Sequence, residues 1–401
     1  MTFAAIQAIK SQNRLHIADG LATAVVVLLP WSISLSLILV VLWLMTIIVT
    51  VRPASIKREV MTAAGGLPVA LFLLALIGMF WSGASWPERL GGMDAFLKLL
   101  AIPILLAQFR HSERAVWPMI GFLASCCALL VLSWIFAIWP ELAFQGSAGY
   151  GVPLKSANTQ VREFVLCALA LLYVAIEKFR ASDKRLAAGL LALALVFFAN
   201  VAYVTVHHWF IIPLILVPGL AVSLLLLAYK QSGTKLMLGL LFGSLAACVM
   251  IYVAYPAAFE HIWLSQLIGI SRPVFWPKSL HFISEAPIFG HGTASIRSLF
   301  AESAIGQTGV MAQITSNPYQ ETLAVGIQFG IIGIAFLWAL WIAHLSLFRS
   351  NRLSDWIGQV VVIFAIVGGL FGSELFDFNQ GWIYVFGVGI AGGVTLRPRQ
   401  Q

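Results

Sequence analysis

Arg272 is the residue of this chain whose chemistry best suits binding a phosphate. It is followed closely by Trp276 and Lys278. A guanidinium can hold a phosphate through two parallel hydrogen bonds, and a nearby ammonium adds a further point charge. The alternative interpretation is an interfacial arginine that extends toward lipid headgroups beside an aromatic residue.

The adjacent pair His207 and His208 is the best candidate for moving a proton. Imidazole titrates near neutral pH, as a general base requires, and its protonated form attracts anions. Trp209 follows the pair directly. Histidine beside tryptophan is also typical of a simple anchor at a membrane surface, so both interpretations stay open.

Further polar residues cluster where two apolar runs begin. Such residues are costly inside a bilayer and often mark a functional site, although helix capping and solvation explain them equally well here. Asp94 and Lys98 lie one helical turn apart, and we expect them to neutralise each other. The polar residues at the starts of the two runs are Asn158, Gln160, Arg162 and Glu163, and Glu374, Asp377, Asn379 and Gln380.

The composition places all of these residues in a membrane protein. The 401 residues are 60% hydrophobic and only 10% charged, and their mean hydropathy is +0.93. Soluble chains carry about 25% charged residues, so the soluble globular, disordered and disulfide-rich secreted classes are excluded. The four cysteines fall inside apolar runs, where packing is a better explanation than metal binding.

Apolar runs long enough to cross a bilayer predict an all-α, polytopic bundle of about twelve transmembrane helices in one membrane domain, 1–401. The first two runs are separated only by a break near Pro30, so eleven spans is the alternative count. The expected spans are 17–31, 33–51, 66–82, 93–109, 116–139, 162–177, 186–204, 209–229, 236–257, 321–346, 355–372 and 376–395.

The positions of the cations predict the orientation of this bundle. Most of the 24 lysines and arginines fall in segments that lie on one side if both termini are cytoplasmic. The net charge of +8 follows from this bias, and we expect no nucleic-acid partner because the cations form no single basic face. The sequence thus predicts a multi-pass inner-membrane protein with its polar site on the periplasmic side.

The longest segment between spans, 258–320, is expected to be a large helical loop on that side. Loops of this length in compact proteins are usually functional. Residues 283–300 can form short amphipathic helices over the mouth of the bundle, interrupted by a turn at Pro287, Gly290 and Gly292.

The residues that close this loop resemble a motif of the bacterial O-antigen ligase and O-antigen polymerase family. Asn317, Pro318, Tyr319 and Gln320 are followed by nine residues and then by Gly330, with Gly333 three positions later. The family pattern is N-P-H-N, nine residues and G-x-x-G, at the entry of the span after the loop. Segment 317–333 matches this register at the start of the tenth expected span, with Tyr319 in place of the family histidine.

Three other parts of the chain are similar to the family. The loop carries Arg272 and Trp276 before a Pro-x-x-Gly-x-Gly stretch at 287–292. Residues 86–89 with Lys98, and Gly381 with Trp382, add weaker similarity. Where the family has a second arginine, near 207–209, this chain has His207 and His208.

The resemblance implies a membrane glycosyltransferase that moves a glycan from undecaprenyl diphosphate to a lipid A-core acceptor, without a metal or other cofactor. Arg272 would then clamp the diphosphate, with Lys278 nearby, while Asn317, Tyr319 and Gln320 line the acceptor side. His207 or His208 would replace the missing base, because a tyrosine of ordinary pKa is a poor base. Membrane lipids would be further partners.

Three alternatives stay open. The chain can be a relative that binds the lipid-linked glycan without turning it over, an O-antigen polymerase, or a transporter or flippase. Ionisable residues at the outer rim, rather than at the midplane, argue against the last.

Overall fold

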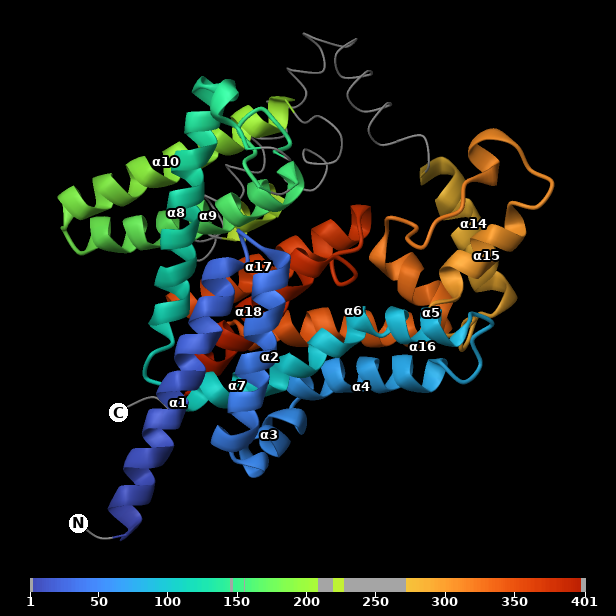
Figure 1. Cartoon of the computed structure of the whole chain (residues 1–401). Helices are drawn as coiled ribbons and strands as arrows, with labels where there is room; N and C mark the ends of the chain where they lie inside the picture. Colours follow the sequence, from blue (N-terminus) through green and yellow to red (C-terminus); the bar gives the residue numbers. More distant parts are fainter. Residues whose placement is uncertain (1–2, 145–146, 155, 208–218, 227–271, 398–401) are drawn as a thin grey trace.

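The structure is a computed structural model that describes residues 3–144, 147–154, 156–207, 219–226 and 272–397 (Figure 1). This part of the chain is all-helical and contains no strand. Seven of its helical segments are long and apolar enough to cross a membrane, or eight if one bent pair counts as a single span. The seven are Ile33–Thr50, Trp86–His111, Val116–Ile138, Ala157–Arg180, Lys184–His207, Glu321–Leu347 and Leu353–Phe371.

These helices fit a membrane-embedded bundle, while the count of twelve spans stays a prediction. The expected span 236–257 and most of 209–229 lie outside the described residues. The expected span 66–82 corresponds to α4 (Ala63–Gly78), which meets α3 (Pro53–Val60) at an angle of 88°. Thr62 caps α4 by accepting a hydrogen bond from the backbone of Gly65.

The first part of the bundle brings together helices from both ends of the chain. In Figure 1, α4 lies beside α16 (Glu321–Leu347), and α7 (Ala101–His111) packs on α18 (Phe378–Thr395). The buried tryptophans Trp43 and Trp341 belong to the apolar core of this part. The remaining helices here are α1 (Phe3–Leu28), α2 (Ile33–Thr50), α5 (Trp86–Gly92), α6 (Asp94–Leu97) and the 3-10 turn η1 (Lys98–Leu100).

The second part contains α8 (Val116–Ile138), α9 (Ala157–Arg180), α10 (Lys184–His207) and α17 (Leu353–Phe371), with the 3-10 turn η2 (Pro140–Leu142) after α8. Trp356 of α17 is fully buried in this core and donates a hydrogen bond to the Leu169 carbonyl of α9, 2.9 Å away. Because α17 packs on both α9 and α18, it joins the two parts.

Two helices of the predicted loop pack on the start of α16. They are α14 (Arg272–Glu285) and α15 (Ser295–Ser303), followed by the 3-10 turn η3 (Gly309–Ala312). Phe275, Phe282 and Phe300 form an aromatic core between them, with edge-on ring contacts of 5.2–5.3 Å. The predicted turn at Pro287, Gly290 and Gly292 does separate the helices of this region.

Helix α16 is broken at Gly330, and the turn between α14 and α15 fills the break. Gly330 has φ +61° and ψ −153°, outside the helical region. The carbonyls of Ile327 and Gln328 accept hydrogen bonds from the N–H groups of His291 and Gly292, at 2.9 and 2.8 Å. Ile331 N–H donates in turn to the Pro287 carbonyl, 2.8 Å away. The turn thereby satisfies backbone groups that a broken helix inside a bilayer would leave unpaired.

Candidate functional site

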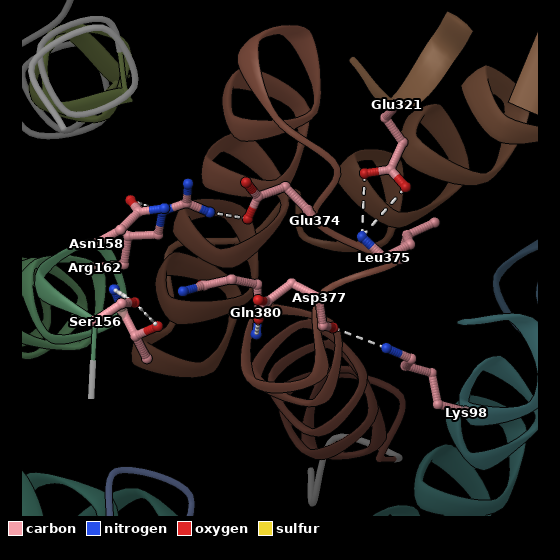
Figure 2. Close-up of polar contacts among 10 residues, drawn as sticks. Lys98, Ser156, Asn158, Arg162, Glu321, Glu374, Leu375, Asp377 and Gln380 are labelled. Atoms are coloured by element: carbon pink, nitrogen blue, oxygen red, sulfur yellow. Dashed lines mark hydrogen bonds and ion pairs between the residues drawn. The ribbon is translucent and has the colours of Figure 1, made fainter. Parts of the chain in front are cut away.

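The buried polar side chains of the bundle meet at the short segment between α17 and α18. We call residues 373–377 the connector. Four positions in it, Ser373, Glu374, Leu375 and Asp377, each bind a different part of the chain. Figure 2 shows the contacts of the last three. The connector is therefore the centre of the candidate site.

Glu374 of the connector forms an ion pair with Arg162 of α9. The pair joins Arg162 Nη1 to Glu374 Oε2, and both side chains are buried. Asn158, one turn earlier, accepts a hydrogen bond from Arg162 Nε at 3.1 Å and so orients the guanidinium. Burial raises the pKa of the Glu374 carboxyl above its ordinary value, and the charge of Arg162 opposes that rise. Gly368 provides the space, because a Cβ there would collide with the Glu374 side chain.

Glu321, the first residue of α16, is held by the backbone of the connector. Its side chain is fully buried, and its two carboxyl oxygens lie 3.2 and 3.1 Å from the N–H of Leu375. Gln320 precedes it as the N-cap, accepting a hydrogen bond from the Leu323 N–H. The start of α16 is therefore fixed against the end of α17.

Lys98 completes this set of charges. Its ammonium is buried and donates to the Asp377 carbonyl oxygen at 2.8 Å. A Cβ at Gly381 would lie 2.5 Å from Lys98 Nζ, so only glycine admits the lysine here. Lys98 forms no direct ion pair with Asp94, which is exposed, although the charge of Asp94 still acts on the lysine.

The turn formed by residues 317–320 is tied to both the connector and the loop helices. The Asn317 amide oxygen accepts hydrogen bonds from Ser373 Oγ at 2.6 Å and from the Tyr319 N–H at 2.8 Å. Trp276 Nε1 of α14 donates to the Pro318 carbonyl at 3.1 Å. Asn317, predicted as a substrate-binding residue, therefore positions the turn through its side chain.

Tyr319 is the side chain that this turn presents outward. It is 40% exposed and its ring stacks on Phe275, with centroids 6.2 Å apart. Its φ of +56° lies in the left-handed region, which tyrosine seldom adopts. Strain of this kind persists only where the surroundings impose it, and it is enriched at functional sites.

The two predicted phosphate ligands lie on α14. Lys278 Nζ donates to the Met311 carbonyl at 2.7 Å and to Ser303 Oγ at 3.2 Å, so this amine links α14 to α15 and η3. Arg272 is the first residue of α14, and its side chain lies outside the described part of the structure. The helix places Arg272 one turn before Trp276, which contacts the 317–320 turn.

His207 ends α10, and His208 lies outside the described residues. The His207 ring stacks on Tyr150 at 5.0 Å and lies 4.4 Å from the Tyr203 ring. Its Nδ1 is 2.8 Å from the Tyr203 carbonyl, which can only accept, so a neutral ring carries its proton on Nδ1. Nε2 then keeps the lone pair that a base needs.

Among the residues that the structure describes, no three His, Cys, Asp or Glu side chains form a group able to hold a metal ion. No protein-family model matches the chain, and no curated protein matches it either. The assignment of function therefore rests on the residues and their geometry.

Sequence reasoning identified the polar residues around the connector but did not foresee how they pair. Glu321 is one of the nine residues between Gln320 and Gly330 in the motif, and its carboxyl is fully buried. The sequence held a usable signal. Glu374, Asp377 and Glu321 stand at the ends of apolar runs, and Arg162 and Lys98 lie close to the starts of two other runs. Charges repeated at the ends of several runs indicate that those ends meet.

Proposed function

We propose that this protein is an O-antigen ligase-like glycosyltransferase of a bacterial inner membrane. It moves a glycan from undecaprenyl diphosphate to a lipid A-core acceptor on the periplasmic side. The observation that carries the proposal is the pairing of two segments that resemble the family: the 287–292 turn binds α16 at its break, within segment 317–333. Two segments that resemble the same family, 287–292 and 317–333, are therefore in direct contact.

The reaction joins an acceptor hydroxyl to the anomeric carbon of the donor glycan. The bond from that carbon to the diphosphate oxygen breaks, and undecaprenyl diphosphate leaves with the electron pair. Arg272 neutralises charge that develops on the leaving group, with Lys278 on the same helix as the second cation. Tyr319 orients a sugar ring by stacking or donates a hydrogen bond to phosphate.

The proton of the acceptor hydroxyl goes to His207 or His208, since an imidazole is a better general base near neutral pH than a phenol. Asn317 and Gln320 hold the turn that presents Tyr319. Glu321 is not a candidate for this role in the present conformation, because its carboxyl is fully buried against Leu375.

The test is a transfer assay with purified protein, undecaprenyl diphosphate-linked O-antigen and lipid A-core. We expect transfer by the wild type, its loss in Arg272→Ala, and its retention in Arg297→Ala, a matched change at an exposed arginine of α15. Full activity of Arg272→Ala would remove the proposed clamp. Donor binding without transfer in the wild type would instead support a non-catalytic relative.

Tyr319→His restores the residue that the family motif carries. Histidine also tolerates a positive φ better than tyrosine does, so the backbone accepts the change. We expect faster transfer by this variant, because a base of near-neutral pKa then stands at the turn. Unchanged transfer would mean that the proton is accepted elsewhere, as by the histidine pair.

Transport of a lipid-linked glycan is the second candidate. It is favoured by the broken helix α16, because discontinuous helices are common in transporters. The protein can be reconstituted in proteoliposomes with a labelled lipid-linked donor. Translocation of the donor across the bilayer without transfer of its glycan would support transport.

A further inference from the structure

An apolar cavity lies between helices of both parts of the bundle, away from the connector. Its volume is about 310 Å³, and it is partly open. The walls include Leu123 of α8, Leu171 of α9, Trp356 of α17 and Phe386 of α18. A cavity of this size is within the range of ligand-binding pockets, and its lining suits a hydrocarbon chain.

The cavity extends along its helices to the end opposite the candidate site. It reaches Leu353, the first residue of α17, and Val116, the first residue of α8. The ion pair of Arg162 and Glu374, by contrast, stands near the start of α9 and beyond the end of α17. The function proposed for the candidate site therefore does not require this cavity.

Two arginines flank the walls of the cavity at that end. Arg352 is the N-cap of α17, directly before Leu353, and Arg114 stands two residues before Val116. Both are half-buried, and the Arg114 guanidinium lies over the Trp117 ring at 4.8 Å.

Acidic residues offset part of that charge. Asp355 is buried and accepts hydrogen bonds from Ser350 and Thr395, and Glu113 is exposed next to Arg114. The buried Asp19 interacts electrostatically with Arg114, and Glu177 is exposed at the end of α9. Lys178 and Arg180 at the end of α9 add further exposed cations. A ligand with an apolar chain and an anionic head complements such an arrangement.

We propose that this cavity binds an acyl chain of an anionic diacyl phospholipid, with Arg114 and Arg352 contacting its phosphate group. Four of the helices that form the walls, α8, α9, α10 and α17, are long and apolar enough to cross a membrane, so the chain enters from the bilayer itself. Basic pockets between transmembrane helices select anionic lipids in this way. A neutral lipid would fill the same walls but gain nothing from the two arginines.

The experiment uses the full-length protein, delipidated in detergent, and native mass spectrometry of the lipid-bound fraction. The probes are dioleoyl phosphatidylglycerol, dioleoyl phosphatidylcholine and undecaprenyl phosphate. We expect the first to bind about tenfold more tightly than the second, and Arg114→Gln/Arg352→Gln to lose about that factor. The matched control Lys57→Gln/Lys184→Gln removes the same charge from exposed positions and should keep the wild-type affinity.

A second variant tests the walls. Ala170→Phe fills the cavity from α9 and should lower binding of both phospholipids, whereas Ala202→Phe on an exposed position of α10 should not. Ile383→Trp replaces Ala170→Phe if the latter does not elute as a folded protein. Equal affinity for the two phospholipids, tighter binding of undecaprenyl phosphate, or equal losses in variant and control would each overturn the proposal.

Discussion

Four buried ionisable side chains distinguish the candidate site from the apolar core around it. Lys98, Arg162, Glu321 and Glu374 are each less than 10% exposed. Removing such groups from water costs several kcal/mol apiece unless hydrogen bonds and opposite charges compensate. The connector supplies this compensation through Glu374, the Leu375 N–H and the Asp377 carbonyl.

The ion pair of Arg162 and Glu374 gives the first prediction on stability. Arg162→Gln leaves a buried carboxylate without its cation, so we expect it to destabilise the protein by about 3–5 kcal/mol. Arg162→Gln combined with Glu374→Gln should cost clearly less than the sum of the single changes. Reversible unfolding in detergent measures these values, with Arg297→Gln as the exposed control. Additive costs would show that the two side chains do not act as a pair.

Lys98 shows why some pairings cannot be deduced from spacing alone. Asp94 and Lys98 have helical spacing, which favours an ion pair on a continuous helix. The chain instead passes from α6 into the 3-10 turn η1 at Lys98, and the lysine turns toward α18. The space left by Gly381, which lies far away in the sequence, decides the outcome.

Lys98→Met tests the role of that contact. Methionine keeps most of the length of the side chain but cannot donate to the Asp377 carbonyl, so we expect a loss of about 1–3 kcal/mol. Gly381→Ala should destabilise similarly by displacing the ammonium. Thermal unfolding of both variants measures this, and an unchanged Gly381→Ala protein would contradict the close approach.

Among the helices, the break in α16 is the feature that organises the loop. The apolar run at 321–346 predicts one continuous span, and nothing in its hydropathy reveals an interruption. The turn at Pro287, Gly290 and Gly292 was predictable from its residue types. The contact of this turn with α16 was not predictable, because it depends on the non-helical backbone conformation of Gly330 in the assembled structure.

Gly330→Ala should therefore destabilise the protein strongly. The change adds a Cβ at positive φ and drives it into the backbone of Pro287 and Ile288. Gly306→Ala is the matched control: Gly306 has φ +74° but open space around its Cβ position, so it reports the conformational strain alone. We expect Gly330→Ala to lower the melting temperature well beyond Gly306→Ala. Equal decreases in melting temperature would mean that the 287–292 turn is not in close contact with Gly330.

At the scale of the whole molecule, the described residues form an all-helical bundle, which is the fold class that the composition and the apolar runs predict. The predicted number of spans rests on the apolar runs, and the predicted orientation rests on the distribution of the cations. Two of the expected spans fall mostly in the part of the chain that the structure does not describe.

Labelling with a membrane-impermeant maleimide tests the orientation. Glu302→Cys lies at an exposed position of α15, and Lys184→Cys at the exposed start of α10. In intact spheroplasts we expect the reagent to label Glu302→Cys, and to label Lys184→Cys only after permeabilisation. The cysteine-free parent provides the background, and the reverse pattern would invert the proposed topology.

The connector also has a consequence for biogenesis. Ribosomes make the chain from its N-terminus, so Lys98 and Arg162 enter the membrane long before residues 373–377 exist. During that interval both cations must find temporary partners in the translocation machinery, in lipid headgroups or in water. The burial of Lys98 and Arg162 is then completed only when α17, the connector and α18 have been synthesised. Assembly of the bundle therefore depends on this late step.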